Sequence, residues 1–335
     1  MPAWASFVIV RSRLRLLVAL ALAAALSACG QSALYGVPGA ESPTPSAPSK
    51  PYSISGLLDP AGGKFFGVEA PGAPDSLGPV QSFAASAGTR PNLIGEYMSW
   101  NDALDAQAVS NAWSYGALYY MVWEPYNTTV AAIAEGHSNS YITSVAQQVR
   151  AVNAPVAISF GHEFNGYWYP WGTTGTTAAQ FVAAWQLIHR LFAAAGATNV
   201  IWVWDPNIIN AEPQLDLSAY YPGDAYVTWV GITGYFGATG ADTFDSVYGP
   251  TMQEIRGFTS KPFIIAETAV QSGPNAAAAA QNLVSGVAQQ PDVLGFAWFD
   301  YDKGGVDWRL EDRPSVRTAL AASLTGLTLI NPKRP

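Results

Sequence analysis

The sequence predicts an α/β fold, a single (β/α)8 TIM barrel over residues 59–330. Eight apolar runs rich in aromatic and β-branched residues alternate with alanine-rich amphipathic runs. The first and eighth apolar runs begin at Lys64 and Val293, which gives about 33 residues for each unit, as expected for a strand followed by a helix. The runs are almost continuously apolar, which is typical of parallel strands that are covered on both faces.

Each strand and helix of this barrel can be placed by its residues. The predicted strands are Lys64–Glu69, Asn92–Trp100, Ala117–Trp123, Val156–His162, Val200–Trp204, Thr228–Tyr235, Pro262–Glu267 and Val293–Asp300. The predicted helices include Ser76–Ala87, Ala106–Trp113, Ser140–Val152, Ala178–Ala195 and Ala276–Gln289. The fourth of these is marked by Phe181, Trp185, Ile188 and Phe192, which recur at helical spacing. Several helices end at a glycine before the next strand, at Gly88, Gly116 and Gly196.

A doubly wound open sheet is the alternative to a barrel. Such a sheet usually carries a glycine-rich phosphate loop directly after its first strand. Here the first predicted strand is followed by APGAPDS, which contains no GxGxxG pattern. Eight units in this length therefore favour the closed barrel.

The first thirty residues predict export rather than folded structure. Arg11, Arg13 and Arg15 precede an uncharged apolar run from Leu16 to Ala28, which is typical of a secretory signal. The run is too short for an ordinary membrane span of about 20 residues. It ends in LSACG, which resembles the lipobox of bacterial lipoproteins. Residues 1–28 are thus predicted to be a lipoprotein signal peptide with Cys29 as the lipidation site, and an ordinary signal peptide with a chance cysteine is the alternative.

Residues 29–58 are predicted to form a tether. Proline and serine dominate the stretch from Val37 to Pro51, and no apolar periodicity is present. A lipid anchor followed by a tether predicts an exported domain that is held at the cell envelope and faces outward. The anchor is then its one predicted contact with the membrane.

Composition excludes several classes of protein. The chain is 49% hydrophobic and 12% charged, with a formal net charge of −8, so it is neither a disordered acidic protein nor suited to neutralising the phosphates of nucleic acid. Its histidines, His137, His162 and His189, are far apart and form no HxH pair. No P-loop or GxSxG elbow is present either. We therefore expect no metal and no cofactor, and a monomeric domain.

Two glutamates stand at the ends of predicted strands. Glu163 follows the fourth strand, and Glu267 ends the seventh. In a barrel, the strand ends at the C-terminal face carry the chemistry, and these two strands face each other across its mouth. Two facing carboxyl groups are the minimum set for glycoside hydrolysis, with one as acid and the other as nucleophile or base. A salt-bridged position at the rim is the alternative for either glutamate.

At these residues the sequence resembles glycoside hydrolase family 26, whose best-known members are endo-β-1,4-mannanases. The resemblance covers roughly residues 60–325 and depends on the order of several short motifs. These are HEFNGYWYPWG from His162, WVWDPN from Trp202, GITGYFG ending at Gly237, IIAETA from Ile264, and Asp307-Trp308-Arg309. It implies a retaining enzyme with Glu163 as acid/base and Glu267 as nucleophile, held by Tyr235.

The resemblance and the strand-end positions also suggest substrate contacts. Trp168, Trp298 and Trp308 are candidate platforms for sugar rings, and Arg309 is a candidate for hydroxyl binding or for a rim salt bridge. His162 is expected to bind the sugar or Glu267. Asn165 could hold the loop or a sugar hydroxyl.

A polysaccharide is therefore the expected partner, and β-1,4-mannan is the substrate that the resemblance implies. Mixed-linkage β-1,3/1,4-glucan and β-1,3-xylan remain alternatives, because the family also contains enzymes that act on them. A non-catalytic glycan-binding lipoprotein on the same barrel is the alternative from another class of protein.

Overall fold

The computed structural model describes residues 52–58, 63–209, 215–239 and 242–333. The predicted signal peptide, Cys29 and residues 29–51 of the predicted tether lie outside these residues. No helix within the described part of the chain is long and apolar enough to span a membrane.

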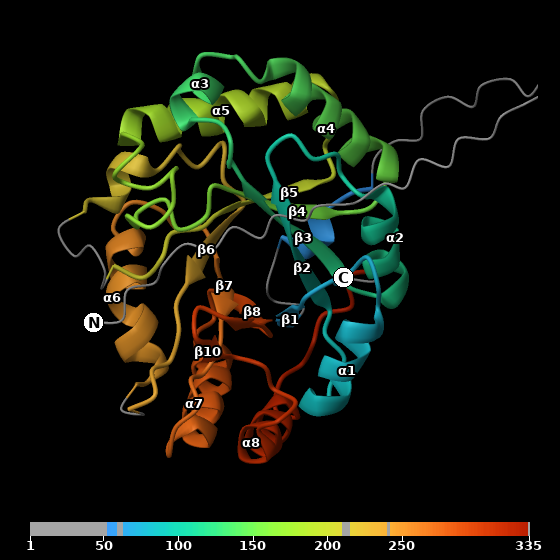
Figure 1. Ribbon diagram of the computed structural model, residues 1–335, viewed down its shortest axis with the longest axis vertical. Helices are drawn as coiled ribbons and strands as arrows, with labels where there is room; N and C mark the ends of the chain where they lie inside the picture. Colours follow the sequence, from blue (N-terminus) through green and yellow to red (C-terminus); the bar gives the residue numbers. More distant parts are fainter. Residues whose placement is uncertain (1–51, 59–62, 210–214, 240–241, 334–335) are drawn as a thin grey trace, which may run out of the picture.

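Eight parallel strands close into a barrel in chain order, with β1 paired to both β2 and β8 (Figure 1). The strands are β1 Phe65–Glu69, β2 Leu93–Ser99, β3 Leu118–Glu124, β4 Val156–Phe160, β5 Val200–Trp204, β6 Trp229–Thr233, β7 Phe263–Thr268 and β8 Val293–Phe299. The predicted TIM barrel is therefore confirmed, with strand bounds that differ from the predicted ones by a few residues.

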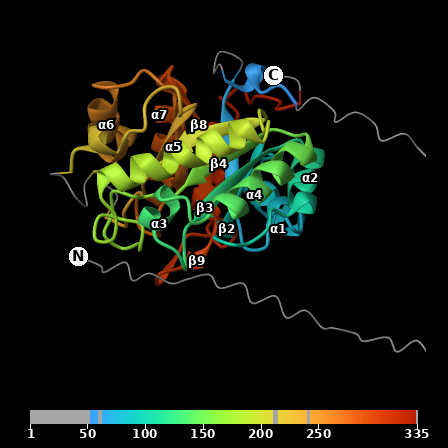
Figure 2. The ribbon, with the colours of Figure 1, turned by 90° about the horizontal axis from the view of Figure 1, so that it is seen from above.

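The helices lie outside the strands. They are α1 Gly78–Ala87, α2 Ala106–Tyr115, α3 Val130–Ala134, α4 Asn139–Val152, α5 Ala178–Ala194, α6 Phe244–Arg256, α7 Ala276–Gln289 and α8 Pro314–Leu324. Figure 2 shows α5 and α4 lying across one side of the strands, with α6 and α1 at opposite ends. Two 3-10 turns, Ser55–Leu57 and Leu217–Tyr220, and a small hairpin of β9 Asp302–Lys303 and β10 Val306–Asp307 complete the described elements.

Local signals in the sequence explain where most helices begin and end. Asp105 caps α2 by accepting from the N–H groups of its first turn, and Thr177 forms a capping box with Gln180 at the start of α5. Gly88 and Gly116 end α1 and α2 with positive φ angles of 66° and 93°, which glycine adopts without steric cost. The glycine helix ends predicted at these two positions are confirmed.

Two apolar layers hold the barrel together because successive strand residues face opposite sides. Inside the barrel pack Phe65, Leu93, Leu118, Tyr120, Val122, Ala157, Ile201, Val203, Trp229, Ile264, Ala266, Leu294 and Ala297. The alternate residues, such as Phe66 and Val68 of β1, pack against the surrounding helices. Leu57 also belongs to the inner layer, so packed structure begins within the segment that was predicted to be tether.

Candidate active site

Glu163 lies in a turn that the predicted strand Val156–His162 did not anticipate. The strand ends at Phe160, and Gly161 and Glu163 both have positive φ angles, of 59° and 52°. Such a backbone is uncommon for a residue with a Cβ and must be held in place by its surroundings. The Glu163 N–H donates to the Asp205 carbonyl at 2.8 Å, which fixes this turn against the end of β5.

Two side chains bind the Glu163 carboxyl group. Trp168 Nε1 donates to its Oε2 at 2.7 Å, and Asn207 Nδ2 donates to its Oε1. Burial, and then the negative charge of Glu267, raise the pKa of Glu163 to about 7, although both hydrogen bonds and the charge of Lys303 oppose the rise. Glu163 can therefore hold a proton near neutral pH and give it to a leaving group.

Glu267 lies in β7 and accepts two hydrogen bonds from tyrosines. Tyr235, which follows β6, donates to Oε1, and Tyr97 of β2 donates to Oε2. The predicted contact between Tyr235 and Glu267 is thus present. Two phenol donors to one carboxylate orient it and suit its ionised form, which is the form that a nucleophile needs.

His162 is buried beside this pair. Its ring centroid lies 4.9 Å from that of Tyr169, 5.8 Å from that of Trp171 and 6.0 Å from that of Tyr97. Burial and the nearby charge of Lys303 lower the pKa of His162 to about 3, so the ring is neutral in the working range of pH. Its Nδ1 has no hydrogen-bond partner within the described residues, and its binding to sugar stays a prediction.

The structure places Asn165 in the first of its two predicted roles and gives Trp298 a different role from the predicted one. Asn165 Nδ2 donates to the Asn207 carbonyl and Asn165 Oδ1 accepts from the Asn207 N–H, each at 2.8 Å, so its amide holds the loop that carries Asn207. Trp298 is fully buried against the surrounding helices, and its Nε1 donates to the Trp308 carbonyl at 3.1 Å. The predicted contact of Trp298 with substrate is therefore wrong, because its indole supports the segment of Trp308 from behind.

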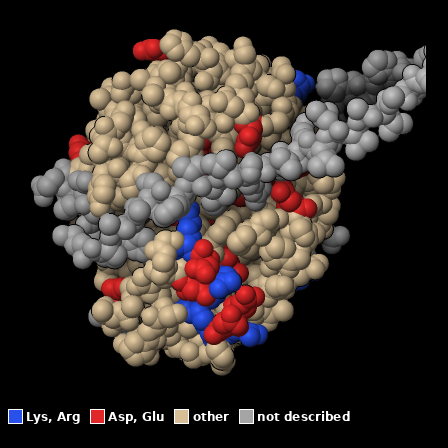
Figure 3. Space-filling view, viewed as in Figure 1, with Lys and Arg blue, Asp and Glu red and all other residues tan. Residues whose placement is uncertain are grey.

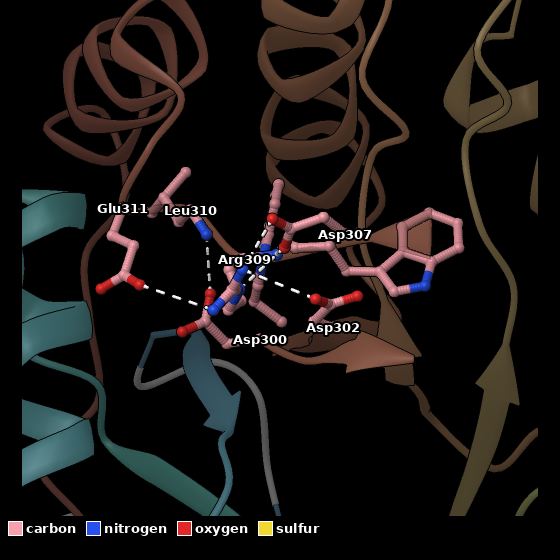
Figure 4. A network of polar contacts seen from close by, with 8 residues as sticks. Asp300, Asp302, Asp307, Arg309, Leu310 and Glu311 are labelled. Atoms are coloured by element: carbon pink, nitrogen blue, oxygen red, sulfur yellow. Dashed lines mark hydrogen bonds and ion pairs between the residues drawn. The ribbon is translucent and has the colours of Figure 1, made fainter. Parts of the chain in front are cut away.

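Trp308 and Arg309 follow the β9–β10 hairpin. The Trp308 ring centroid lies 4.6 Å from that of Tyr235, which places this indole at the edge of the site. Arg309 makes two bonds of 2.9 Å to the Asp307 carboxylate and lies within 4 Å of Asp302 and Glu311 (Figure 4). Figure 3, which is viewed from the same side as Figure 1, shows acidic and basic side chains gathered on the lower part of the surface. Arg309 thus takes the rim salt bridge that was one of its two predicted roles.

Sequence reasoning missed several side chains at the mouth of the barrel, namely Glu69, Tyr97, Glu124, Asn207 and Lys303. Burial raises the pKa of Glu124, the last residue of β3, to about 8. Lys303 Nζ lies 5.6 Å from the ring centroids of both Tyr97 and Phe299. Every second residue of a strand faces the same side. Counting in steps of two from the inward-facing Phe65, Leu93 and Leu118 therefore places Glu69, Tyr97 and Glu124 inside the barrel.

No group of three or more histidine, cysteine, aspartate or glutamate side chains is placed to hold a metal ion within the described residues. The polar side chains that the structure places at the site include carboxyl groups, phenols and one neutral histidine. An acid with a raised pKa beside a carboxylate bound by two phenols is the pairing that general acid and nucleophilic catalysis require.

A profile described as Glycosyl hydrolase family 26 matches residues 107–273, about half of the chain. Endoglucanase H of Acetivibrio thermocellus is 31% identical over 268 residues, which are 75% of this chain and 29% of that protein. A mannan endo-1,4-beta-mannosidase of Bacillus subtilis is 30% identical over 114 residues, which are 32% of this chain and 28% of that protein. The chain thus spans under a third of the length of these relatives.

Solved structures share the fold. A modular endo-beta-1,4-mannanase from Cellulomonas fimi matches with a TM-score of 0.67 and 16% identity, over 84% of this chain and 75% of that chain. The catalytic domain of an endo-beta-1,4-mannanase from Bacillus sp. JAMB-750 matches with a TM-score of 0.63 and 16% identity, over 80% of this chain and 88% of that chain.

Proposed function

Because the chain belongs to glycosyl hydrolase family 26 and is a glycosidase of that family, we propose that it cleaves internal bonds of a β-linked polysaccharide with retention of configuration. The observation that supports this proposal most directly is the pairing of Glu163 with Glu267. One carboxyl group holds a proton near pH 7, and the other accepts hydrogen bonds from two phenols.

The reaction then takes two steps. In the first, Glu267 attacks the anomeric carbon while Glu163 gives its proton to the departing glycosidic oxygen. The resulting glycosyl-enzyme ester removes the negative charge of Glu267, which had raised the pKa of Glu163. Glu163 is then the stronger acid and its ionised form more populated, so it can take a proton from the incoming water in the second step. This mechanism requires the two carboxyl groups to lie about 5–5.5 Å apart.

β-1,4-Mannan is the first candidate substrate. The Bacillus subtilis relatives are named mannan endo-1,4-beta-mannosidases, and the Cellulomonas fimi enzyme is named an endo-beta-1,4-mannanase. β-Glucan is the second candidate, because the relative whose match covers 75% of the chain is named an endoglucanase. The test is to incubate residues 52–335 with β-mannan, mixed-linkage β-glucan, cellulose and β-1,3-xylan, and to follow the products by chromatography and the anomeric signals by NMR.

Retained anomers and oligosaccharides of intermediate length from one of these substrates support the proposal, and inverted anomers contradict it. Glu163→Gln and Glu267→Gln should each abolish hydrolysis of the polysaccharide. A protein that binds one of these glycans without cleaving it, and whose binding survives both substitutions, would instead be the glycan-binding lipoprotein.

We also propose that Cys29 carries a lipid that holds the domain at the outer side of the cell envelope. The lipobox-like LSACG and the Pro/Ser-rich stretch after it support this proposal. Cells that express the whole chain and are fed a clickable fatty acid should label the protein, and Cys29→Ser should remove the label. Equal labelling of Cys29→Ser would refute the anchor.

A further inference from the structure

We propose that Glu69 is a positioning residue for Glu267. Glu69 is a neutral acid, and it donates its proton to the Tyr97 hydroxyl oxygen. Tyr97 then keeps its own proton directed at Glu267. This inference rests on the proposed role of Glu267 as the nucleophile, and it assigns a task to a buried carboxyl group that the reaction itself does not use.

Counting protons at Tyr97 leads to this assignment. The Tyr97 Oη lies 3.0 Å from Glu69 Oε2 and is also hydrogen-bonded to Glu267 Oε2. A phenol has one proton to donate, so it cannot donate to two carboxylate oxygens. The pKa of Tyr97 is raised well above its usual value, mainly by burial, so its own proton stays in place. One of the two carboxyl groups must therefore supply the second proton.

The surroundings show which carboxyl group carries that proton. Glu267 has a second phenol donor in Tyr235, whereas Glu69 Oε1 has no hydrogen-bond partner within the described residues. Glu69 is fully buried, and burial, followed by the charge of Glu267, raises its pKa well above the ordinary value. The charged and titratable groups that act on it from other elements are Tyr97 of β2, Tyr120 of β3, Asp205 after β5, Tyr235 after β6, Glu267 of β7 and Lys303 of β9.

The neighbouring strand leaves room for Glu69. A Cβ atom added to Gly95 of β2 would lie 2.4 Å from Glu69 Cγ and 2.8 Å from its Oε1. Gly95 pairs with Glu69 in the sheet register, so the missing side chain at that inward position is what admits the carboxyl group. The inner wall of the barrel is thus shaped around Glu69.

The first test compares two substitutions of similar size. In Glu69→Gln the amide still donates to the Tyr97 oxygen, so we expect kcat within about threefold of wild type and an unmoved acid limb of the pH profile. Glu69→Met has no donor, so we expect kcat to fall about tenfold with KM little changed, and the acid limb to move up by about one pH unit. A loss in Glu69→Gln as large as in Glu69→Met would overturn the proposal, as would an unchanged Glu69→Met.

A double-mutant cycle separates this relay from a merely structural role. Tyr97→Phe removes the link between Glu69 and Glu267, so adding Glu69→Met to Tyr97→Phe should lower kcat no further. If the two losses multiply instead, Glu69 acts through packing and the proposal is wrong. Circular dichroism and urea unfolding check that each variant folds.

A measurement without catalysis keeps this inference distinct from the proposed function. Infrared spectra at neutral pH should contain a band of neutral carboxylic acid that is lost in Glu69→Gln. Absence of that difference sinks the inference even in an active enzyme. Conversely, a chain that hydrolyses no glycan while Glu69 shows the band would refute the function and leave the protonation of Glu69 standing.

Discussion

The hydrogen bond from Trp168 to Glu163 offers a direct test of the proposed acid. Trp168→Phe removes a donor that lies 2.7 Å from Glu163 Oε2 and keeps an aromatic ring in its place. Because this bond favours the ionised carboxylate, its loss should raise the pKa of Glu163 above its present value of about 7. The acid then keeps its proton to higher pH, and the basic limb of the kcat/KM profile should move upward.

The size of this movement follows from the strength of the bond. A hydrogen bond to a charged group contributes about 1.5–3 kcal/mol, and one pKa unit corresponds to about 1.4 kcal/mol. With Asn207 still bound to the other oxygen, we expect a movement of about one pH unit. The assay is kcat/KM on a soluble oligosaccharide between pH 5 and 9. Tyr167→Phe, in the same loop and exposed, is the matched control and should leave the profile unchanged. A basic limb that stays in place or moves downward in Trp168→Phe would refute Glu163 as the acid.

Two further predictions concern stability, and a third concerns substrate binding. Glu124 keeps its proton in the folded state up to a pH of about 8 while the unfolded chain loses it near pH 4.5, so the free energy of unfolding should fall as pH rises through this window, by about 1.4 kcal/mol per pH unit for this one group. Urea unfolding should show a shallower fall in Glu124→Gln than in the exposed control Glu135→Gln, and equal slopes would contradict the assignment. Gly286→Ala would place a Cβ 2.3 Å from Phe244 Cβ and should lower the free energy of unfolding by about 1–3 kcal/mol in the same assay, so a variant as stable as wild type would show that α7 can shift. Trp298→Phe removes the bond to the Trp308 carbonyl and should raise KM without moving the pH limbs, and a moved limb would mean that Trp298 acts on the carboxyl groups after all.

The barrel could be predicted from the sequence because each strand is a continuous apolar run that is separated from the next by a helical pattern. The helix α6 was missed for a physical reason. It contains Gly249 and Pro250, and proline lacks the N–H that continues a helix, so the segment shows a weak helical signal. Packing of Phe244, Tyr248 and Met252 against the core holds the helix in spite of this interruption.

The sequence indicates candidate site residues only where they stand at the ends of predicted strands. Glu163 and Glu267 stand out in the sequence because a charge after an apolar run is conspicuous. Trp298 was misplaced because β8 departs from strict two-residue alternation. Leu294 and Ala297, three positions apart, both face the inside of the barrel, with a φ angle of 151° at Gly295 between them, and Trp298 consequently turns outward. The left-handed turn at Glu163 could not be found this way, because it depends on the bond from its N–H to the Asp205 carbonyl, which lies far along the chain.

The distribution of hydrogen-bond donors divides the tasks among the carboxyl groups at the barrel mouth. Glu69, Glu124, Glu163 and Asp205 all have raised pKa values because burial and mutual repulsion disfavour their charged forms. Repulsion between the negative charges limits how many of these carboxyl groups can be ionised together, but it does not determine which one is ionised. Glu267 receives two tyrosine hydroxyls, whereas Glu69 shares only the Tyr97 hydroxyl, and its Oε1 has no hydrogen-bond partner among the residues that the structure describes. In the proposed mechanism Tyr97 and Tyr235 thus select Glu267 as the nucleophile, so moving either phenol should exchange charge among the carboxyl groups before it alters the fold.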